Sequence, residues 1–239
     1  MVRPLINIIG SVFTIITLGA IGFAITIGAV FWIYGRDLPS HESLSQYKPP
    51  TISRIYSVEG QIIDEFARER RLFPPSRENP PSVKYPFIPA ASTTFLCHTG
   101  SDVRGIISAI VDAVRSGGQV VRGASTITQQ VMKNFLLDGS RQAERKIKEI
   151  ILATRIENTL PKNKILELYL NEIFLGQNSY GVTAAAQTYF NKTLDQLAPH
   201  EAAFLAALPK APSKFHPVRK KDRLLERRNY VLREMWQNG

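Results

Sequence analysis

The stretch Gly123-Ala124-Ser125-Thr126-Ile127-Thr128-Gln129-Gln130, followed by Lys133-Asn134, begins a predicted helix with hydroxyl and amide side chains. Ser125 could cap this helix, which would place free backbone N–H groups and hydroxyls at its N-terminus, where phosphate and other anions bind. Gln130 and Lys133 or Asn134 follow one turn later and would project near the same surface. Ser and Thr caps are common, so the stretch alone also fits an ordinary helix start.

Helical patterns continue on both sides of this stretch. Asp102 is a candidate N-cap for an upstream helix with one apolar face, which Gly117-Gly118 would end. Gly and Pro residues separate the later segments, as expected at helix ends. The predicted helices after the first are 126–137, 141–160, 164–175, 182–190, 199–208 and 219–236. The sequence therefore predicts a mainly α domain.

A basic run, Arg145-Lys146-Ile147-Lys148-Glu149, lies within the second of these helices. Arg145 and Glu149 are four residues apart and share a face, so an exposed ion pair contributing a few tenths of a kcal/mol is one interpretation. In the functional interpretation, a guanidinium and an ammonium hold a diphosphate while Glu149 orients them or helps to bind a divalent metal.

A third block combines polar residues with small ones. Glu167 and Asn171 are polar in an otherwise apolar helix, and Tyr180-Gly181 precedes a run of small side chains. We expect most of this block to serve close helix packing, with the two polar residues supporting a site from behind.

The chain upstream of residue 100 has a different character. Strand-like runs at 52–56 and 61–66 flank a Gly-containing turn, which predicts a small β hairpin. Residues 72–89 contain six prolines, so extended or irregular chain is expected there.

Residues 5–34 carry no charged side chain, and about 20 apolar residues suffice to cross a bilayer. A cleaved signal peptide would have a shorter apolar region and a small-residue cleavage site, and a buried core helix would not need thirty uncharged residues. The run predicts a single membrane anchor. Arg3 favours a cytoplasmic N-terminus with the main domain on the exported side.

Composition limits the remaining possibilities. About 200 residues follow the anchor, which suffices for one domain with a sizeable core. Cys97 is the single cysteine, so it identifies no compartment. The formal charge of +10 suggests a polyanionic partner, and beside a membrane anchor anionic lipid or a phosphorylated substrate is favoured over nucleic acid. The divisions expected are 1–36 for the cytoplasmic tip and anchor, 37–72 for a linker and hairpin, and 73–239 for the helical domain.

Taken together and in this order, the blocks resemble a known family. Residues 87–229 are similar to the peptidoglycan glycosyltransferase domain that polymerises lipid II. The preceding chain, with Tyr47-Lys48-Pro49-Pro50, Arg54-Ile55-Tyr56 and Glu69-Arg70-Arg71, looks like the membrane-proximal part of class A penicillin-binding proteins of the 1A type. Such proteins continue into a transpeptidase domain. No Ser-x-x-Lys run with a later Lys-Thr-Gly is present here, so the chain is expected to stop before that domain.

The resemblance implies a lysozyme-like all-helical fold at the bacterial inner membrane. It also implies an inverting transfer in which one lipid-linked disaccharide attacks the growing chain and expels a polyprenyl diphosphate. Possible aids are Mg²⁺ or Mn²⁺, and possible partners are other cell-wall synthesis proteins. The residues implied to bind substrate are Phe95, His98, Ser125, Thr126, Gln129, Gln130, Lys133, Asn134, Arg145 and Lys146; Glu149 would manage the leaving group, and Glu167, Asn171 and Tyr180 would support the site.

The first motif departs from the family pattern, Glu-Asp-x-x-Phe-x-x-His-x-Gly. Phe95, His98 and Gly100 match it, but Ala91 and Ser92 occupy the positions of the two acids. The expected general base is absent from position 91, and loss of such a base typically lowers the rate about 10²- to 10⁴-fold.

Three functions remain open from the sequence. One is a polymerase of the family type, impaired by Ala91. The second is a catalytically silent protein that binds lipid II or scaffolds wall synthesis. The third is a lysozyme-like enzyme that cuts glycan, which Lys133, Arg145 and Lys146 disfavour because a glycan-cutting enzyme has no diphosphate to hold.

Overall fold

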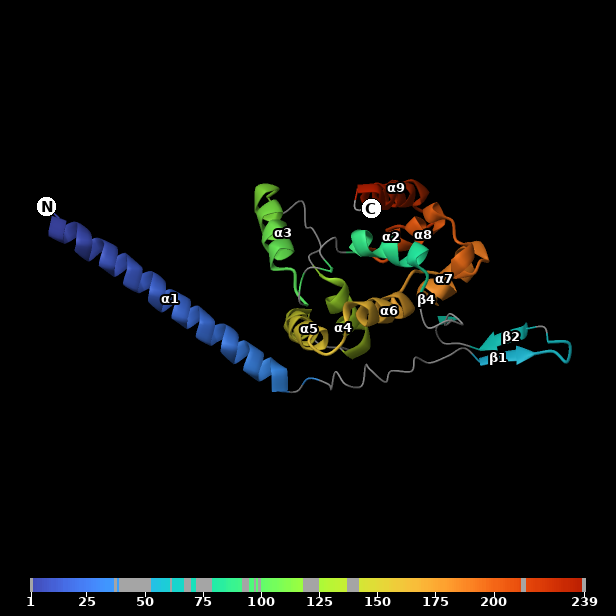
Figure 1. Ribbon diagram of the computed structural model, residues 1–239, viewed down its shortest axis with the longest axis horizontal. Helices are drawn as coiled ribbons and strands as arrows, with labels where there is room; N and C mark the ends of the chain where they lie inside the picture. Colours follow the sequence, from blue (N-terminus) through green and yellow to red (C-terminus); the bar gives the residue numbers. More distant parts are fainter. Residues whose placement is uncertain are drawn as a thin grey trace.

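The computed structural model describes residues 2–36, 38, 53–60, 62–66, 70–71, 79–91, 95–96, 98, 100–117, 125–136, 142–211 and 214–237. These residues are mainly helical, as the sequence predicts. Figure 1 shows a long helix, α1 (Val2–Arg36), that projects from a compact group of shorter helices. The predicted linker lies largely outside the described residues.

Helix α1 is apolar over most of its length and does not belong to a core. Gly10–Arg36 is long and apolar enough to cross a membrane, and none of its most apolar window is buried. The hydroxyls of Thr14, Thr17 and Thr26 donate to backbone carbonyls one turn earlier, so these polar groups are satisfied within the helix. An exposed helix of this kind excludes the interpretation of α1 as a buried core helix.

The β structure is small. Strand β1 (Ser53–Tyr56) pairs antiparallel with β2 (Ile62–Phe66), with a register shift between Ile55 and Tyr56. Strand β3 (Arg70–Arg71) pairs in parallel with β4 (Ser179–Tyr180), which precedes α7. The second pairing attaches the chain that follows β2 to the helical domain.

The predicted helices are present, with ends that differ by a few residues. Their bounds are α3 (Val103–Arg115), α4 (Ile127–Leu136), α5 (Gln142–Glu157), α6 (Lys162–Glu172), α7 (Val182–Phe190), α8 (Pro199–Ala207) and α9 (Lys221–Gln237). Asp102 caps α3 as predicted, since its Oδ1 accepts a hydrogen bond from Gly105 N at 2.8 Å. Helix α6 contributes fully buried side chains, Ile165 and Leu170 among them, and packs against α4 and α7 (Figure 1).

Residues 81–91 contradict the expectation of irregular chain. Helix α2 (Pro81–Ala91) contains Pro86 and Pro89 in its interior and packs against α8 and α9. Val83 and Phe87 are fully buried there, and burying each such side chain contributes about 1.5–3 kcal/mol. Tertiary packing therefore outweighs the local cost of proline in this helix. Residues 72–78 lie outside the described part.

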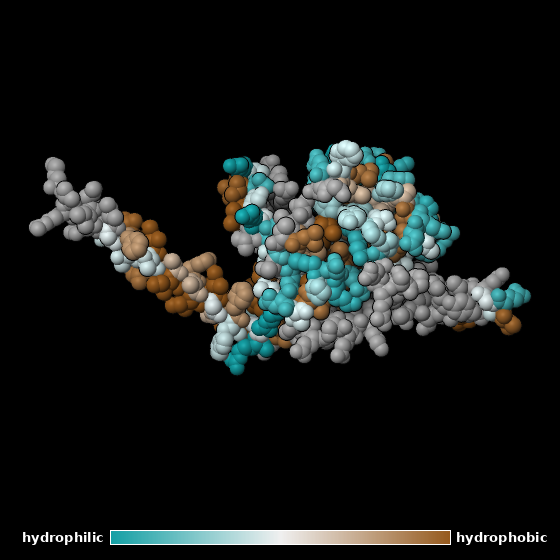
Figure 2. Space-filling model, viewed as in Figure 1, coloured by the Kyte–Doolittle hydropathy of each residue, from teal (hydrophilic) through white to brown (hydrophobic). Residues whose placement is uncertain are grey.

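Helix α3 exposes part of its apolar face. Ile107, Val111 and Val114 are 56%, 39% and 76% exposed. In Figure 2 these apolar side chains of α3 form a brown surface on the side of the domain from which α1 extends. Such an exposed apolar face is available to an apolar environment.

Candidate active site

The N-terminus of α4 is capped by Thr126 and not by Ser125. Thr126 Oγ1 accepts a hydrogen bond from Gln129 N at 3.2 Å and donates one to Gly100 O at 2.8 Å. The expectation that Ser125 is the cap was wrong, because Ile127 is the first helical residue and the cap is the residue directly before it. Ser125 is exposed and is left to bind another group.

That group is Lys146, which joins the first two sequence blocks. Its Nζ donates to Ser125 Oγ at 2.7 Å, to Gln129 Oε1 at 3.1 Å and to Glu149 Oε2 at 2.9 Å. The three acceptors match the three protons of an ammonium group. The side chain is still 43% exposed, so a ligand can reach it.

Glu149 is buried between two cations. Its side chain is 6% exposed, and Arg145 Nε lies 3.4 Å from Oε1, whereas Lys146 Nζ contacts Oε2. The interpretation as an exposed surface pair is therefore wrong for the carboxylate, although the spacing of four residues is as predicted. Two positive charges against one negative charge leave this corner with a net positive charge. We call Ser125, Gln129, Arg145, Lys146 and Glu149 the Lys146 cluster.

The remaining predicted residues on α4 lie further along the helix. Lys133 and Asn134 are exposed, and Gln130 is partly buried. They add one more cation and two amides to the helix that carries Gln129. Gly123 and Ala124 lie outside the described residues.

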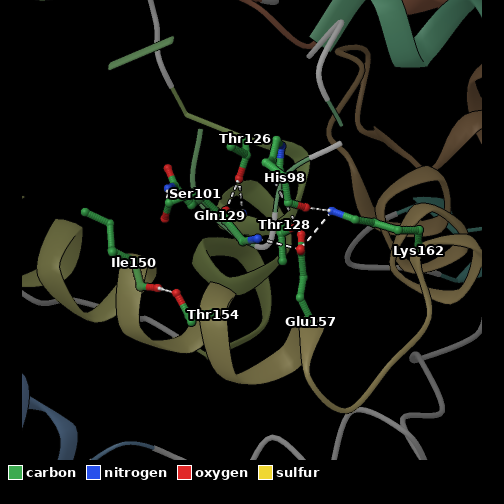
Figure 3. Close-up of polar contacts among 10 residues, drawn as sticks. His98, Ser101, Thr126, Thr128, Gln129, Ile150, Thr154, Glu157 and Lys162 are labelled. Atoms are coloured by element: carbon green, nitrogen blue, oxygen red, sulfur yellow. Dashed lines mark hydrogen bonds and ion pairs between the residues drawn. The ribbon is translucent and has the colours of Figure 1, made fainter. Parts of the chain in front are cut away.

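Phe95 and His98 lie in the segment between α2 and α3. Figure 3 shows His98 beside Thr128. Phe95 is fully buried, its ring meets that of His98 edge-on at 6.2 Å, and Lys162 Nζ lies 4.6 Å from its centroid. Burial lowers the pKa of His98, and the positive charge of Lys162 lowers it further, against an opposing effect of Glu157. Both effects favour the neutral form of the imidazole.

Ala91 ends α2 and offers no titratable group. The neighbouring carbonyl, Ala90 O, accepts a hydrogen bond from Arg227 Nη2 of α9 at 2.9 Å. A half-buried guanidinium is therefore bound to the backbone one residue before position 91. Ser92 lies outside the described residues.

The three residues expected to support the site, Glu167, Asn171 and Tyr180, take part in the packing of α6 and β4. Glu167 pairs with Lys164 at 2.8 Å, and the rings of Tyr180 and Phe174 lie 4.9 Å apart. The backbone of Asn171 lies against Gly181, where an added methyl group would meet Asn171 O at 2.4 Å. These contacts lie on elements other than α4 and α5, which carry the Lys146 cluster.

Sequence reasoning missed Glu157, the last residue of α5. Its side chain is 2% exposed and pairs with Lys162 Nζ at 2.8 Å. The available signal was that Glu157 is the only acid between Glu149 and Glu167. An acid isolated in an apolar helix segment is worth examining, because buried charges are usually paired.

The described residues do not fit a resident metal site. Among them no three His, Cys, Asp or Glu side chains lie close enough together to hold an ion. The carboxylate of Glu149, which was expected to help a divalent ion, is already held by Arg145 and Lys146. We therefore assign no step to a protein-bound metal.

Comparison with known proteins gives the family. Residues 59–236 match the family model described as transglycosylase. The chain is 45% identical over 221 residues to a protein named penicillin-binding protein 1A from Rickettsia prowazekii, covering 92% of this chain and 28% of that protein. Proteins of the same name from Neisseria flavescens and Escherichia coli K12 are 47% and 44% identical, over 84% and 89% of this chain and 25% of each relative. A crystal structure of penicillin-binding protein 1A from Haemophilus influenzae aligns with a TM-score of 0.41 at 29% identity, covering 79% of this chain and 18% of that one.

The chain thus spans about a quarter of the length of these curated relatives. The family match includes both blocks of the Lys146 cluster and the segment with Phe95 and His98, and it extends upstream to residue 59, before β2. With identities near 45% over most of its length, this chain belongs to the transglycosylase family of the penicillin-binding proteins 1A.

Proposed function

We propose that this chain is a membrane-anchored peptidoglycan glycosyltransferase that binds lipid II and lipid-linked glycan through their diphosphate, and that Ala91 impairs its polymerising step. The observation that carries the proposal is the Lys146 cluster. It joins Ser125 and Gln129 of one family motif to Arg145, Lys146 and Glu149 of another.

The cluster has the chemistry needed to bind a departing diphosphate. Arg145 and Lys146 supply two partly exposed cations, and Glu149 holds both in place from the buried side. Charge-assisted hydrogen bonds to phosphate are stronger than neutral ones, and they strengthen further as charge develops on the leaving group. A phosphate oxygen could replace Ser125 Oγ as an acceptor for Lys146, because Ser125 is exposed.

Deprotonation of the attacking hydroxyl is the step that this chain is least equipped to catalyse. The attacking hydroxyl must lose its proton, and Ala91 cannot accept one. We expect the rate to be about 10²- to 10⁴-fold below that of a relative with a carboxylate there. The second candidate is a catalytically silent protein that binds lipid II or scaffolds wall synthesis. Ala91 supports this candidate too, because it removes the general base.

A membrane setting accounts for the two exposed apolar features. Helix α1 is long enough to span a bilayer, and α3 exposes Ile107, Val111 and Val114 on the same side of the domain. A polyprenyl-linked substrate stays in the bilayer, so a tethered domain would meet it in two dimensions. We propose a single-pass inner-membrane protein with its N-terminus in the cytoplasm, as Arg3 favours, and a lysozyme-like domain at 73–239 on the exported side.

The test uses the full chain in detergent, labelled lipid II and Mg²⁺. The comparison variants are the double substitution Ala91→Glu, Ser92→Asp and the single substitution Lys146→Met. The guanidinium of Arg227 near position 91 would favour the ionised form of the new carboxylates. Lys146→Met should weaken lipid II binding in the native chain, and in the double-variant background it should also lower polymerisation.

Each outcome separates the candidates. Slow polymerisation by the native chain and faster polymerisation by the double variant would support an impaired polymerase. Lipid II binding with polymerisation only by the double variant would support the silent binder. Lipid II binding that Lys146→Met leaves unchanged would overturn the role of the cluster, and fragments released from preformed glycan would favour a glycan-cutting enzyme.

A further inference from the structure

Glu157 collects hydrogen-bond donors from three separate segments. Its Oε2 accepts from Gly100 N at 2.5 Å and pairs with Lys162 Nζ of α6 at 2.8 Å, while Oε1 accepts from Thr128 Oγ1 of α4. His98 Nδ1 lies 3.9 Å from Oε1. Figure 3 shows His98, Thr128 and Lys162 around the side chain of Glu157. A carboxylate that is 2% exposed cannot reach a substrate, so its role must act through the groups it holds.

Lys162 also binds the segment between α2 and α3. Besides Glu157, its Nζ donates to His98 O at 2.5 Å and lies over the ring of Phe95. The pair of Glu157 and Lys162 thus fixes the backbone at two points, His98 O and Gly100 N. Both points lie in the motif that follows position 91.

A path of hydrogen bonds, with the peptide link between Gly100 and Ser101 as one step, leads from Glu157 to Lys146. Gly100, held by Glu157, accepts from Thr126 Oγ1 through its carbonyl. The next residue, Ser101, accepts from Gln129 Nε2 at 3.1 Å, and Gln129 Oε1 accepts from Lys146 Nζ at 3.1 Å. Every hydrogen bond in this path joins groups that are buried or partly buried, so water competes with them little.

We propose that Glu157 is a positioning residue: through Gly100, Ser101 and Gln129 it orients Lys146 for a diphosphate ligand. The ligand class rests on the proposed function, whereas the positioning itself rests on the contacts above. The negative charge is essential to the role, because Glu157 accepts from an ammonium, a hydroxyl and a backbone N–H together. A neutral amide has one acceptor oxygen and would face at least one of these donors with its own N–H₂ group.

The main variant is Glu157→Gln, and the chain offers a matched control. Glu201 is also a poorly exposed carboxylate that pairs with a lysine, Lys192, at 2.8 Å and accepts from a backbone N–H, that of Ala198, at 2.9 Å. Glu201 lies on α8 and is not part of the hydrogen-bond path that leads to Lys146. Glu201→Gln should therefore lower the melting temperature without altering the Lys146 cluster.

Two measurements on the full chain in detergent test the proposal. The first is hydrogen exchange of the peptides that contain Gly100, Ser101 and Gln129, which needs no ligand. Glu157→Gln should speed exchange there, and Glu201→Gln should not. The second is calorimetric binding of inorganic pyrophosphate, which Glu157→Gln should weaken about 2- to 30-fold while Glu201→Gln leaves it unchanged.

A milder variant covers the case in which Glu157→Gln fails to fold. Thr128→Val keeps the shape of the side chain and the carboxylate but removes one donor, so it should weaken pyrophosphate binding in the same direction by a smaller factor. Native exchange and affinity in Glu157→Gln would overturn the proposal, and so would native exchange and affinity in Thr128→Val where Glu157→Gln does not fold. Equal losses in Glu201→Gln would also overturn it, because they would indicate a global effect. A third result is also informative: the native chain binds no pyrophosphate, but Glu157→Gln still exchanges faster. That result would contradict the diphosphate ligand and would support the positioning role.

Discussion

Arg155 Nη2 donates a hydrogen bond to Gly35 O at 3.0 Å, which fastens the last turn of α1 to α5. Gly35 is buried at this contact, and a methyl group there would lie 2.9 Å from Arg155 Nη2. A cation at the C-terminus of a helix is favoured because the last carbonyls carry partial negative charge. Since α5 also carries Lys146, the apolar helix and the Lys146 cluster are attached to the same element.

Arg155→Ala should loosen this attachment without unfolding the domain. We expect a broader distribution of distances between α1 and the helical domain, because the hydrogen bond to Gly35 O is lost. The measurement is electron–electron resonance in lipid nanodiscs, with spin labels at Ile21→Cys and Asn163→Cys in a Cys97→Ser background. Arg104→Ala on α3 removes an exposed arginine elsewhere and is the control. An unchanged distribution in Arg155→Ala would show that the contact does not orient the domain.

The sequence predicted those parts of the fold that depend on neighbours along the chain. Helix α7 has the predicted bounds because Gly181 precedes it and Asn191, with φ +52°, ends it. Asp102 was identified as a cap because it lies directly before an apolar pattern. The two motifs of the Lys146 cluster were recognised, but their junction was not, because Lys146 and Ser125 are 21 residues apart.

The sequence-based predictions were wrong or incomplete where contacts between distant segments determine the structure. Helix α2 forms despite Pro86 and Pro89 because Val83 and Phe87 are buried against α8 and α9. The role of Glu157 depends on Gly100, 57 residues away, and no local pattern reveals such a contact. Ser125 and Thr126 are adjacent and both can cap, so only the position of the first helical turn distinguishes them.

Gly181→Ala should be strongly destabilising. Gly181 has φ +79° and ψ 155°, a region that essentially only glycine adopts, and its added Cβ would lie 2.4 Å from Asn171 O. Gly117 is the matched control, because it has φ +60° but no atom within 4 Å of an added Cβ. We expect a loss of about 1–2 kcal/mol for Gly117→Ala and about 1–3 kcal/mol more for Gly181→Ala. Urea unfolding in detergent measures both, and equal losses would contradict the close approach to Asn171.

Pro89→Ala should stabilise α2. Proline in a helix interior lacks the N–H that would donate one turn back, at a cost of about 3 kcal/mol, part of which alanine should recover. Pro81 is the control, because at the first helical position the missing N–H has no partner to lose. We expect the melting temperature to rise in Pro89→Ala and to stay nearly constant in Pro81→Ala. A fall in Pro89→Ala would mean that the ring contributes more through packing than it costs in the helix.

The lowered pKa of His98 predicts a dependence of stability on pH. Burial first, and then Lys162, hold this pKa below 6.5, against opposing effects of Glu157 and Asp102. As the pH falls below about 6.5, the unfolded chain binds a proton that the folded chain does not. Stability should therefore decrease between pH 6.5 and the folded pKa, with a slope of at most about 1.4 kcal/mol per pH unit.

His98→Gln should remove this component of the slope, because glutamine does not titrate. The measurement is the free energy of unfolding by urea in detergent at intervals between pH 5 and 8, for the native chain and for the variant. His200→Gln, which changes an exposed histidine on α8, is the control and should keep the native slope. If the native chain and His98→Gln lose stability equally as the pH falls, the pKa of His98 does not differ between the folded and unfolded chains, which would contradict its lowering by burial and by Lys162.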